Sequence, residues 1–235
     1  MNRALPLAAM LLIAGGLAAA DGPSLLQSGC VFGGNNDPAN TADLAMPDGD
    51  SHGLLLVRIQ ADSGTRTPVS VSYDGIALKA LLPTRTADSG FLQTWYLAQP
   101  PSDGSHPLEV DCKDGFHGHS WNVVEEVYCG VDTADPFGAK AHGLFRESAT
   151  WKLKFKTRFD RSVIDDFLEV ADNPSTFVPS GDQVLDEEAP WCGGGASVNR
   201  GDHMDAPKAG TYALGYALDT PKTGAYQILE IRGAP

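Results

Sequence analysis

The hydrophobic and polar positions of this chain follow a short period and show no long helical repeat. After residue 20, short runs that are apolar or strictly alternating recur between clusters of Gly, Pro, Asn and Asp. Strands separated at hairpin-like spacing by such turn residues are typical of sandwiches and jelly rolls. We therefore predict an all-β protein, an antiparallel β-sandwich of jelly-roll-like topology with about ten to twelve strands.

Two segments show the pattern most clearly. From Trp151 to Phe159 every second residue is apolar, except Thr157, and the residues between them are cationic. Because side chains alternate across a strand, this predicts one buried and one solvent-facing side. The apolar set is Trp151, Leu153, Phe155 and Phe159, and the cationic set is Lys152, Lys154, Lys156 and Arg158. In contrast, Leu54–Val57 is apolar on both faces and is predicted to lie centrally.

The first 20 residues have the features of an export signal. Arg3 gives a positive start, Ala4–Ala20 is almost wholly apolar, and Ala18 and Ala20 place small residues before a cleavage point. We predict a signal peptide over residues 1–20 and one β-sandwich domain over residues 21–235, since neither a linker nor a repeat divides the chain. The expected location is extracytoplasmic, either secreted or at the cell surface.

Charge and hydropathy narrow the classes of partner. The formal net charge is −13, with 30 Asp and Glu against 17 Lys and Arg. Nucleic acids and anionic membranes attract cationic surfaces, so neither is an expected partner. No second apolar run approaches the roughly 20 residues that a membrane-spanning helix needs.

Four cysteines are spread over the chain, at Cys30, Cys112, Cys129 and Cys192. An even number in an exported protein favours two structural disulfides, and four cysteines allow three connectivities, which stay open. A zinc site has little support because no C-x-x-C pair occurs.

A resemblance to a known family rests on motifs between Leu54 and Gly138. The motifs are the apolar strand Leu54–Val57, the Tyr73-Asp74-Gly75 turn, Trp95-Tyr96-Leu97 followed by Pro100-Pro101, and Cys129-Gly130-Val131-Asp132 running on to Pro136-Phe137-Gly138. This order resembles a family of exported bacterial β-sandwich domains of secreted and cell-surface proteins. The resemblance implies a jelly-roll-like sandwich and export, and it lends no catalytic residues.

Carboxylate pairs are the first candidates for chemistry. The acidic groups that could supply half of a glycosidase pair are Asp165-Asp166 with Glu169, Glu125-Glu126, and Asp186-Glu187-Glu188. Such a pair needs two carboxyl groups about 5–9 Å apart across a cleft. In an acidic protein these runs are more often solvated strand faces, which is the preferred interpretation.

Metal sites are the second candidates. His117 and His119 are two residues apart, so on an extended segment both rings share a face and could ligate Zn²⁺ or Cu²⁺ with His52, His106 or Asp114. The Asx-rich segment 35–50 offers oxygen ligands for calcium, although Asx turns are the commoner explanation of such a segment. Neither a complete metal motif nor a G-x-S-x-G nucleophile motif is present.

Ligand-binding candidates are charged or aromatic. The cationic row Lys152, Lys154, Lys156 and Arg158 could hold an anionic glycan, or pair with acids such as Asp166 on a neighbouring strand. Trp121 and Trp191 are predicted in loops, where they could stack on sugars, while Trp95 and Trp151 are predicted in the core.

The preferred function is an exported, non-catalytic surface or matrix module that binds a glycan or an extracellular protein. The alternatives are an extracellular carbohydrate-active hydrolase or lyase on a jelly roll, and a structural subunit of an extracellular assembly.

Overall fold

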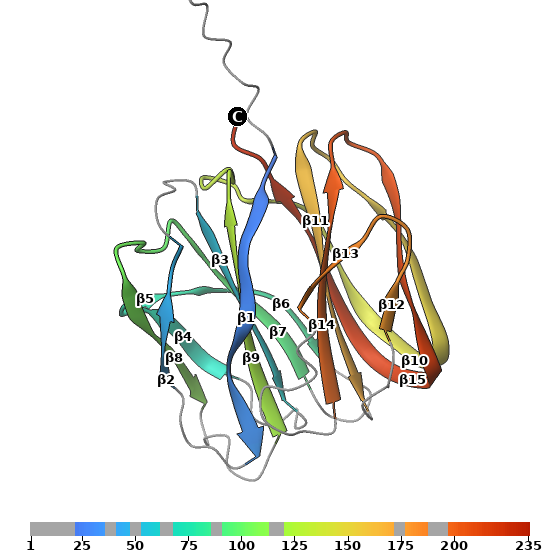
Figure 1. Ribbon diagram of the computed structural model, residues 1–235, viewed down its shortest axis with the longest axis horizontal. Helices are drawn as coiled ribbons and strands as arrows, with labels where there is room; N and C mark the ends of the chain where they lie inside the picture. Colours follow the sequence, from blue (N-terminus) through green and yellow to red (C-terminus); the bar gives the residue numbers. More distant parts are fainter. Residues whose placement is uncertain are drawn as a thin grey trace, which may run out of the picture.

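The computed structural model describes residues 22–35, 41–47, 53–61, 68–85, 91–112, 120–171, 177–187 and 197–235. In these ranges it contains fifteen strands, all paired antiparallel, and no helix. The prediction of an all-β antiparallel sandwich is confirmed, and the strands outnumber the expected ten to twelve. They form three sheets, which we call the end sheet, the central sheet and the curled sheet (Figure 1).

The end and central sheets together form a jelly roll. The central sheet has the order β1 (Ser24–Asn35), β9 (Ser120–Cys129), β3 (Leu54–Ala61), β7 (Phe91–Ala98) and β6 (Lys79–Arg85). The end sheet has the order β2 (Thr41–Ala45), β8 (Ser105–Cys112), β4 (Pro68–Tyr73) and β5 (Ile76–Ala77). The pairs β1–β9, β2–β8, β3–β7 and β4–β5 nest inside one another, so the chain winds as one long hairpin folded over two sheets.

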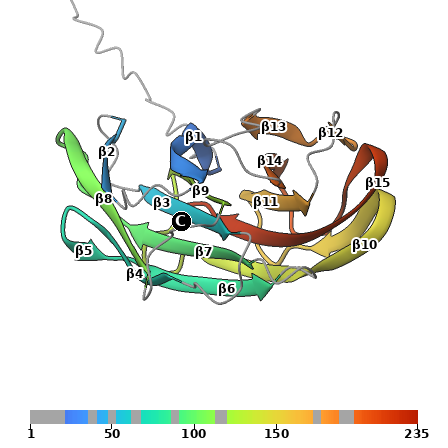
Figure 2. The same cartoon turned by 90° about the horizontal axis from the view of Figure 1, so that it is seen from below.

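The curled sheet contains the rest of the described chain. Its order is β10 (Phe137–Lys156), β15 (Thr211–Arg232), β11 (Ser162–Ala171), β14 (Ser197–Ala206) and β13 (Val184–Glu187). The short β12 (Phe177–Pro179) pairs with β15 as well. The β10–β15 register shifts between Phe145 and Thr150. Such irregularities bend strands, and in Figure 2 both strands curve at the end of the molecule away from the jelly roll.

Each sheet interface has its own apolar core. Leu55 and Val57 pack toward the end sheet, where Tyr73 and Val110 meet them. Leu54 and Leu56, with Tyr128, pack the other way against Val163, Leu229 and Ile231 of the curled sheet. Leu54–Val57 is therefore buried on both faces, as its sequence predicts. A third core lies within the curled sheet, around Trp151, Phe155, Leu168 and Leu214.

The alternating segment of β10 places its two faces as predicted up to Lys156. Trp151 and Phe155 are buried at 6% and 4% exposure, whereas Lys152, Lys154 and Lys156 are exposed. The prediction is wrong for Phe159, which is 36% exposed. The strand ends at Lys156, and the side chain of Phe159 stacks under the Arg232 guanidinium, 4.0 Å from its ring centre.

A buried carboxylate explains why the strand stops there. Glu230 accepts hydrogen bonds from the backbone N–H groups of Arg158 and Phe159, at 2.9 and 2.8 Å, and from Ala139 N–H at 2.6 Å. These amides are satisfied by a side chain rather than by a neighbouring strand, so the chain can turn toward β11. Arg158 remains exposed but lies beyond the strand that carries the three lysines.

Candidate functional site

The candidate catalytic carboxylates are not on solvated faces. Those that the structure describes are buried, which corrects the sequence interpretation; they are Glu125, Glu126, Asp165, Asp166 and Glu169. The side chains of Asp186, Glu187 and Glu188 lie outside the described part. Glu125-Glu126 lies on β9 and Asp165-Asp166 lies on β11, and each of these strands is in the interior of its sheet. Because side chains alternate along a strand, each pair places one carboxyl group on each face of its sheet.

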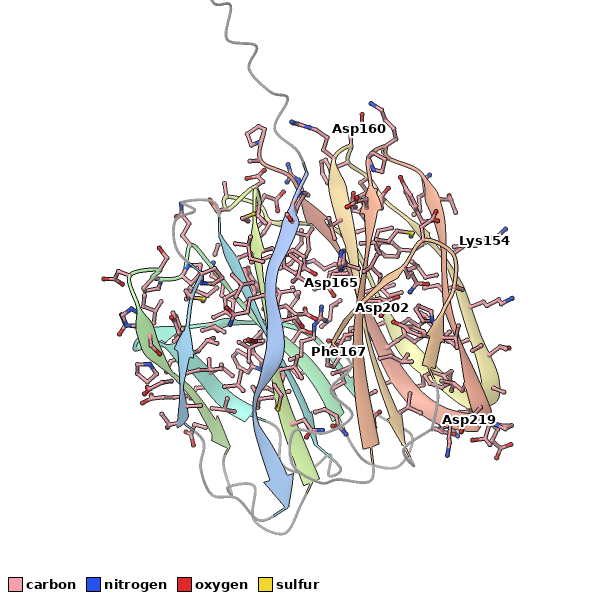
Figure 3. All side chains as sticks on the ribbon, viewed as in Figure 1. Lys154, Asp160, Asp165, Phe167, Asp202 and Asp219 are labelled. Carbon is pink, nitrogen blue, oxygen red and sulfur yellow. The ribbon has the colours of Figure 1, made fainter. Side chains whose placement is uncertain are left out.

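Arg58 gathers two of these carboxyls at the junction of the jelly roll and the curled sheet. Its Nε donates to Glu126 Oε2 at 2.9 Å, and its Nη2 donates to Asp165 Oδ1. Its Nη1 is 3.3 Å from Thr94 Oγ1, and the guanidinium lies 4.8 Å from the centre of the Phe167 ring. We call Arg58, Glu126 and Asp165 the junction cluster. Figure 3 shows Asp165 and Phe167 between the two halves of the molecule.

The junction cluster is sealed from solvent. All three side chains have 0% exposure, so a substrate has no access to them. The pKa of Glu126 is raised to about 8, mainly because burial disfavours its charged form; Arg58 opposes this rise and the nearby Asp165 adds to it. At neutral pH Glu126 is therefore protonated, which reduces the negative charge buried beside Arg58.

This protonation predicts a pH-dependent stability that Glu126→Gln removes. Between about 4.5 and about 8 the folded chain holds a proton on Glu126 that the unfolded chain releases. The free energy of unfolding should therefore fall as pH rises through this window, on the order of a few kcal/mol from this group. Urea titrations at several pH values should give a shallower fall for Glu126→Gln, and equal slopes for the two proteins would contradict the assignment.

A second buried acid organises the inside of the curled sheet. Asp166 accepts hydrogen bonds from Tyr216 Oη and, at 2.8 Å, from Gln183 Nε2. Burial, then the nearby charges of Asp166 and Asp202, raise the pKa of Tyr216 well above its usual value. Asp166 therefore does not pair with the lysine row, as the sequence had suggested, because it lies on the inner side of the sheet.

Gln183 also fixes the turn before β13. Its Oε1 accepts from Gly215 N–H at 2.8 Å, and Ser180 N–H donates to Gly215 O at 2.9 Å. The turn is thus held against β15 on the side away from β10. This places Ser180 and Gly181 as one wall beside the outer face of β15.

The outer face of the curled sheet carries a row of cations beside small residues. We call Lys152, Lys154 and Lys156 the basic face. Their partners on β15 are Gly215, Ala213 and Thr211, in that order. An open depression of about 480 Å³ lies here, lined by Lys152, Lys154, Ser180, Gly181 and residues of β15. Lys154 points outward at this end of the molecule (Figure 3).

The outer face of the end sheet carries the opposite charge. Asp43 on β2 and Glu109 and Asp111 on β8 are exposed. Glu109 accepts a hydrogen bond from Ser72 Oγ at 3.2 Å. We call these three side chains the acidic face. The end sheet and the outer part of the curled sheet lie at opposite ends of the long axis (Figures 1 and 2).

Several predicted site residues lie outside the described part of the chain. They are His117, His119, Trp191, Cys192 and most of the proposed calcium segment. Trp121 is in strand β9 rather than in a loop, and its side chain is not described. Trp95 and Trp151 are buried, as predicted. Within the described ranges, no group of three or more His, Cys, Asp or Glu is arranged to hold a metal ion.

The cysteines depart in part from the expected two disulfides. Cys30 is disulfide-bonded. Cys129, half-buried at the end of β9, is a thiol in this structure, which disagrees with the expectation that all four cysteines are oxidised. No complete disulfide lies between side chains that the structure describes, so the connectivity stays a prediction.

A helix long and apolar enough to cross a membrane is not found among the described residues.

Comparison with known proteins gives little. Neither a family model nor a curated protein matches the sequence. Among solved structures, the major capsid protein P2 from bacteriophage PM2 matches with 11% identity and a TM-score of 0.28, over 88% of this chain and 97% of that chain. A similarity at this level carries no conclusion about function or assembly.

Proposed function

We propose that this protein is an exported, non-catalytic structural subunit that binds other protein chains through its charged outer strand faces. The observation that carries the proposal is the division of its ionisable groups. Of the carboxyls that could do chemistry, those whose side chains the structure describes are buried, and those of the junction cluster are fully sealed, whereas the basic and acidic faces are exposed on regular strands. Export is supported by the apolar Ala4–Ala20 segment and its small residues at the cleavage point.

A protein partner fits the basic face better than a sugar does. Sugar recognition on sandwiches uses exposed aromatic rings. Here the rings of this region point inward, with Trp151, Phe155 and Tyr216 all buried. On β15, the strand between the lysines of β10 and the short β12, the described residues on the outer face are small. They are Thr211, Ala213, Gly215 and Ala217. A surface of lysines over small residues offers charge pairing and close approach, but no platform for a sugar ring.

The proposal is tested by looking for assembly and for catalysis in the same preparation. We expect the purified mature protein, examined at increasing concentration by negative-stain electron microscopy, to form regular multi-subunit particles. We expect no release of reducing ends from neutral or anionic polysaccharides under the same conditions. Polysaccharide cleavage by the wild type, or dispersed single subunits at every concentration, would overturn the proposal.

A further inference from the structure

We propose that the partner of the basic face is the acidic face of a second copy of this chain, joined head to tail. This inference rests on the proposed function and names the partner that the assembly uses. It follows from three features of the molecule. They are the positions of the two faces, the spacing of their charges, and the contrast between the basic face and the net negative charge of the chain.

The two faces lie where a head-to-tail contact needs them. The acidic face is on the outer side of the end sheet, and the basic face is on the outer side of the curled sheet. The central sheet lies between these two sheets, so the faces are at opposite ends of the long axis (Figures 1 and 2). One molecule cannot bring its own two faces together, but neighbouring copies can, and each copy would leave one face of either kind open.

The spacing of the charges also matches. Lys152, Lys154 and Lys156 are alternate residues of one strand, and Glu109 and Asp111 are alternate residues of another. Alternate residues on a strand are separated by about 6.4–6.8 Å. Two such strands laid face to face can therefore pair their charges in register over at least two positions.

The basic face is a local exception on an acidic chain. With a net charge of −13, copies of this protein repel one another in most orientations, which leaves a contact between opposite faces as the favoured one. Exposed acids of the curled sheet, such as Glu147 on β10, Asp219 on β15 and Asp182 in the turn before β13, lie outside the segment Lys152–Lys156. Because the two contacting surfaces differ, the association is heterologous and builds rings or open chains.

Charge reversal provides the test. Lys154→Glu/Lys156→Glu makes both ends acidic, and Glu109→Lys/Asp111→Lys makes both ends basic. Each variant alone should sediment as a monomer, with self-association weakened at least roughly tenfold from the wild type. An equimolar mixture of the two variants should associate again, since each then meets an end of opposite charge. Lys79→Glu/Lys208→Glu is the control for charge, because it makes the same change of charge at exposed lysines outside the basic face. Lys208 also loses its exposed ion pair with Asp160, which contributes little to stability, and this variant should associate like the wild type.

The outcomes separate the inference from the proposed function. Melting curves should first show that each variant unfolds within a few degrees of the wild type, as expected for changes at exposed side chains. If the wild type assembles and the variants assemble equally well, or if the mixture fails to recover, the head-to-tail contact is wrong while the structural function stands. If the wild type stays monomeric at low salt, both are wrong. Loss of binding to an anionic polysaccharide such as heparin without any change in self-association would assign the basic face to a glycan instead.

Discussion

Replacing Arg58 by Met should lower the free energy of unfolding by about 3–5 kcal/mol, because it leaves the Asp165 carboxylate buried without its cation. Arg58 has no exposed surface and donates to both Glu126 and Asp165. Methionine has a similar length but donates no hydrogen bond. Urea denaturation at neutral pH measures the loss directly. A loss below about 1 kcal/mol would show that the cluster is hydrated or rearranged rather than sealed at the junction.

A matched double change separates the charge from the packing. Arg58→Met/Asp165→Asn removes the cation together with the anion, so no buried charge is left without its counter-ion. This variant should be more stable than Arg58→Met alone, since removal of one partner of a buried ion pair usually costs more than replacement of both. If it is no more stable than the single variant, the cost of Arg58→Met does not come from an unbalanced charge on Asp165 but from the lost contacts of Arg58 with Phe167 and Glu126.

Replacing Phe155 by Ala should also cost about 3–5 kcal/mol, the usual range for a buried aromatic side chain. Phe155 is 4% exposed and packs in the core of the curled sheet. Lys154→Ala, at the preceding residue on the outer face, is the control and should change stability by less than about 0.5 kcal/mol. Thermal or urea unfolding compares the two. Equal effects at both positions would show that the faces of β10 are wrongly assigned.

The fold could be predicted from the sequence where apolar and polar residues alternate clearly, or where a strand is apolar on both faces. Leu54–Val57 and Trp151–Phe155 were placed correctly because their side chains follow the period of a strand. β14 (Ser197–Ala206) could not be predicted from alternation because its residues are mostly polar, and it is held by pairing with β11 instead. The end of β10 was missed because it depends on Glu230, which is distant in sequence.

The candidate site was harder to predict. Asp165 and Asp166 look like a solvated acidic pair in the sequence, yet they lie on a strand that is covered on both sides. Their burial is made possible by Arg58, Tyr216 and Gln183, none of which is near them in the chain. One signal was available: a single arginine in the otherwise apolar strand Leu54–Ile59 predicts a buried counter-ion. The acidic face could not be identified from sequence, because Asp43 and Glu109 come together only when β2 pairs with β8.

Sedimentation velocity of the mature wild-type protein, at several concentrations and at two ionic strengths, tests the central claim most directly. If charged outer faces hold copies of this chain together, the sedimentation coefficient should rise with concentration at low salt and return to that of a single subunit at about 0.5–1 M salt, where charges are screened beyond a few ångströms. A single sedimenting species with the mass of one chain, at every concentration and at both ionic strengths, would contradict the proposal that this protein is a self-assembling structural subunit.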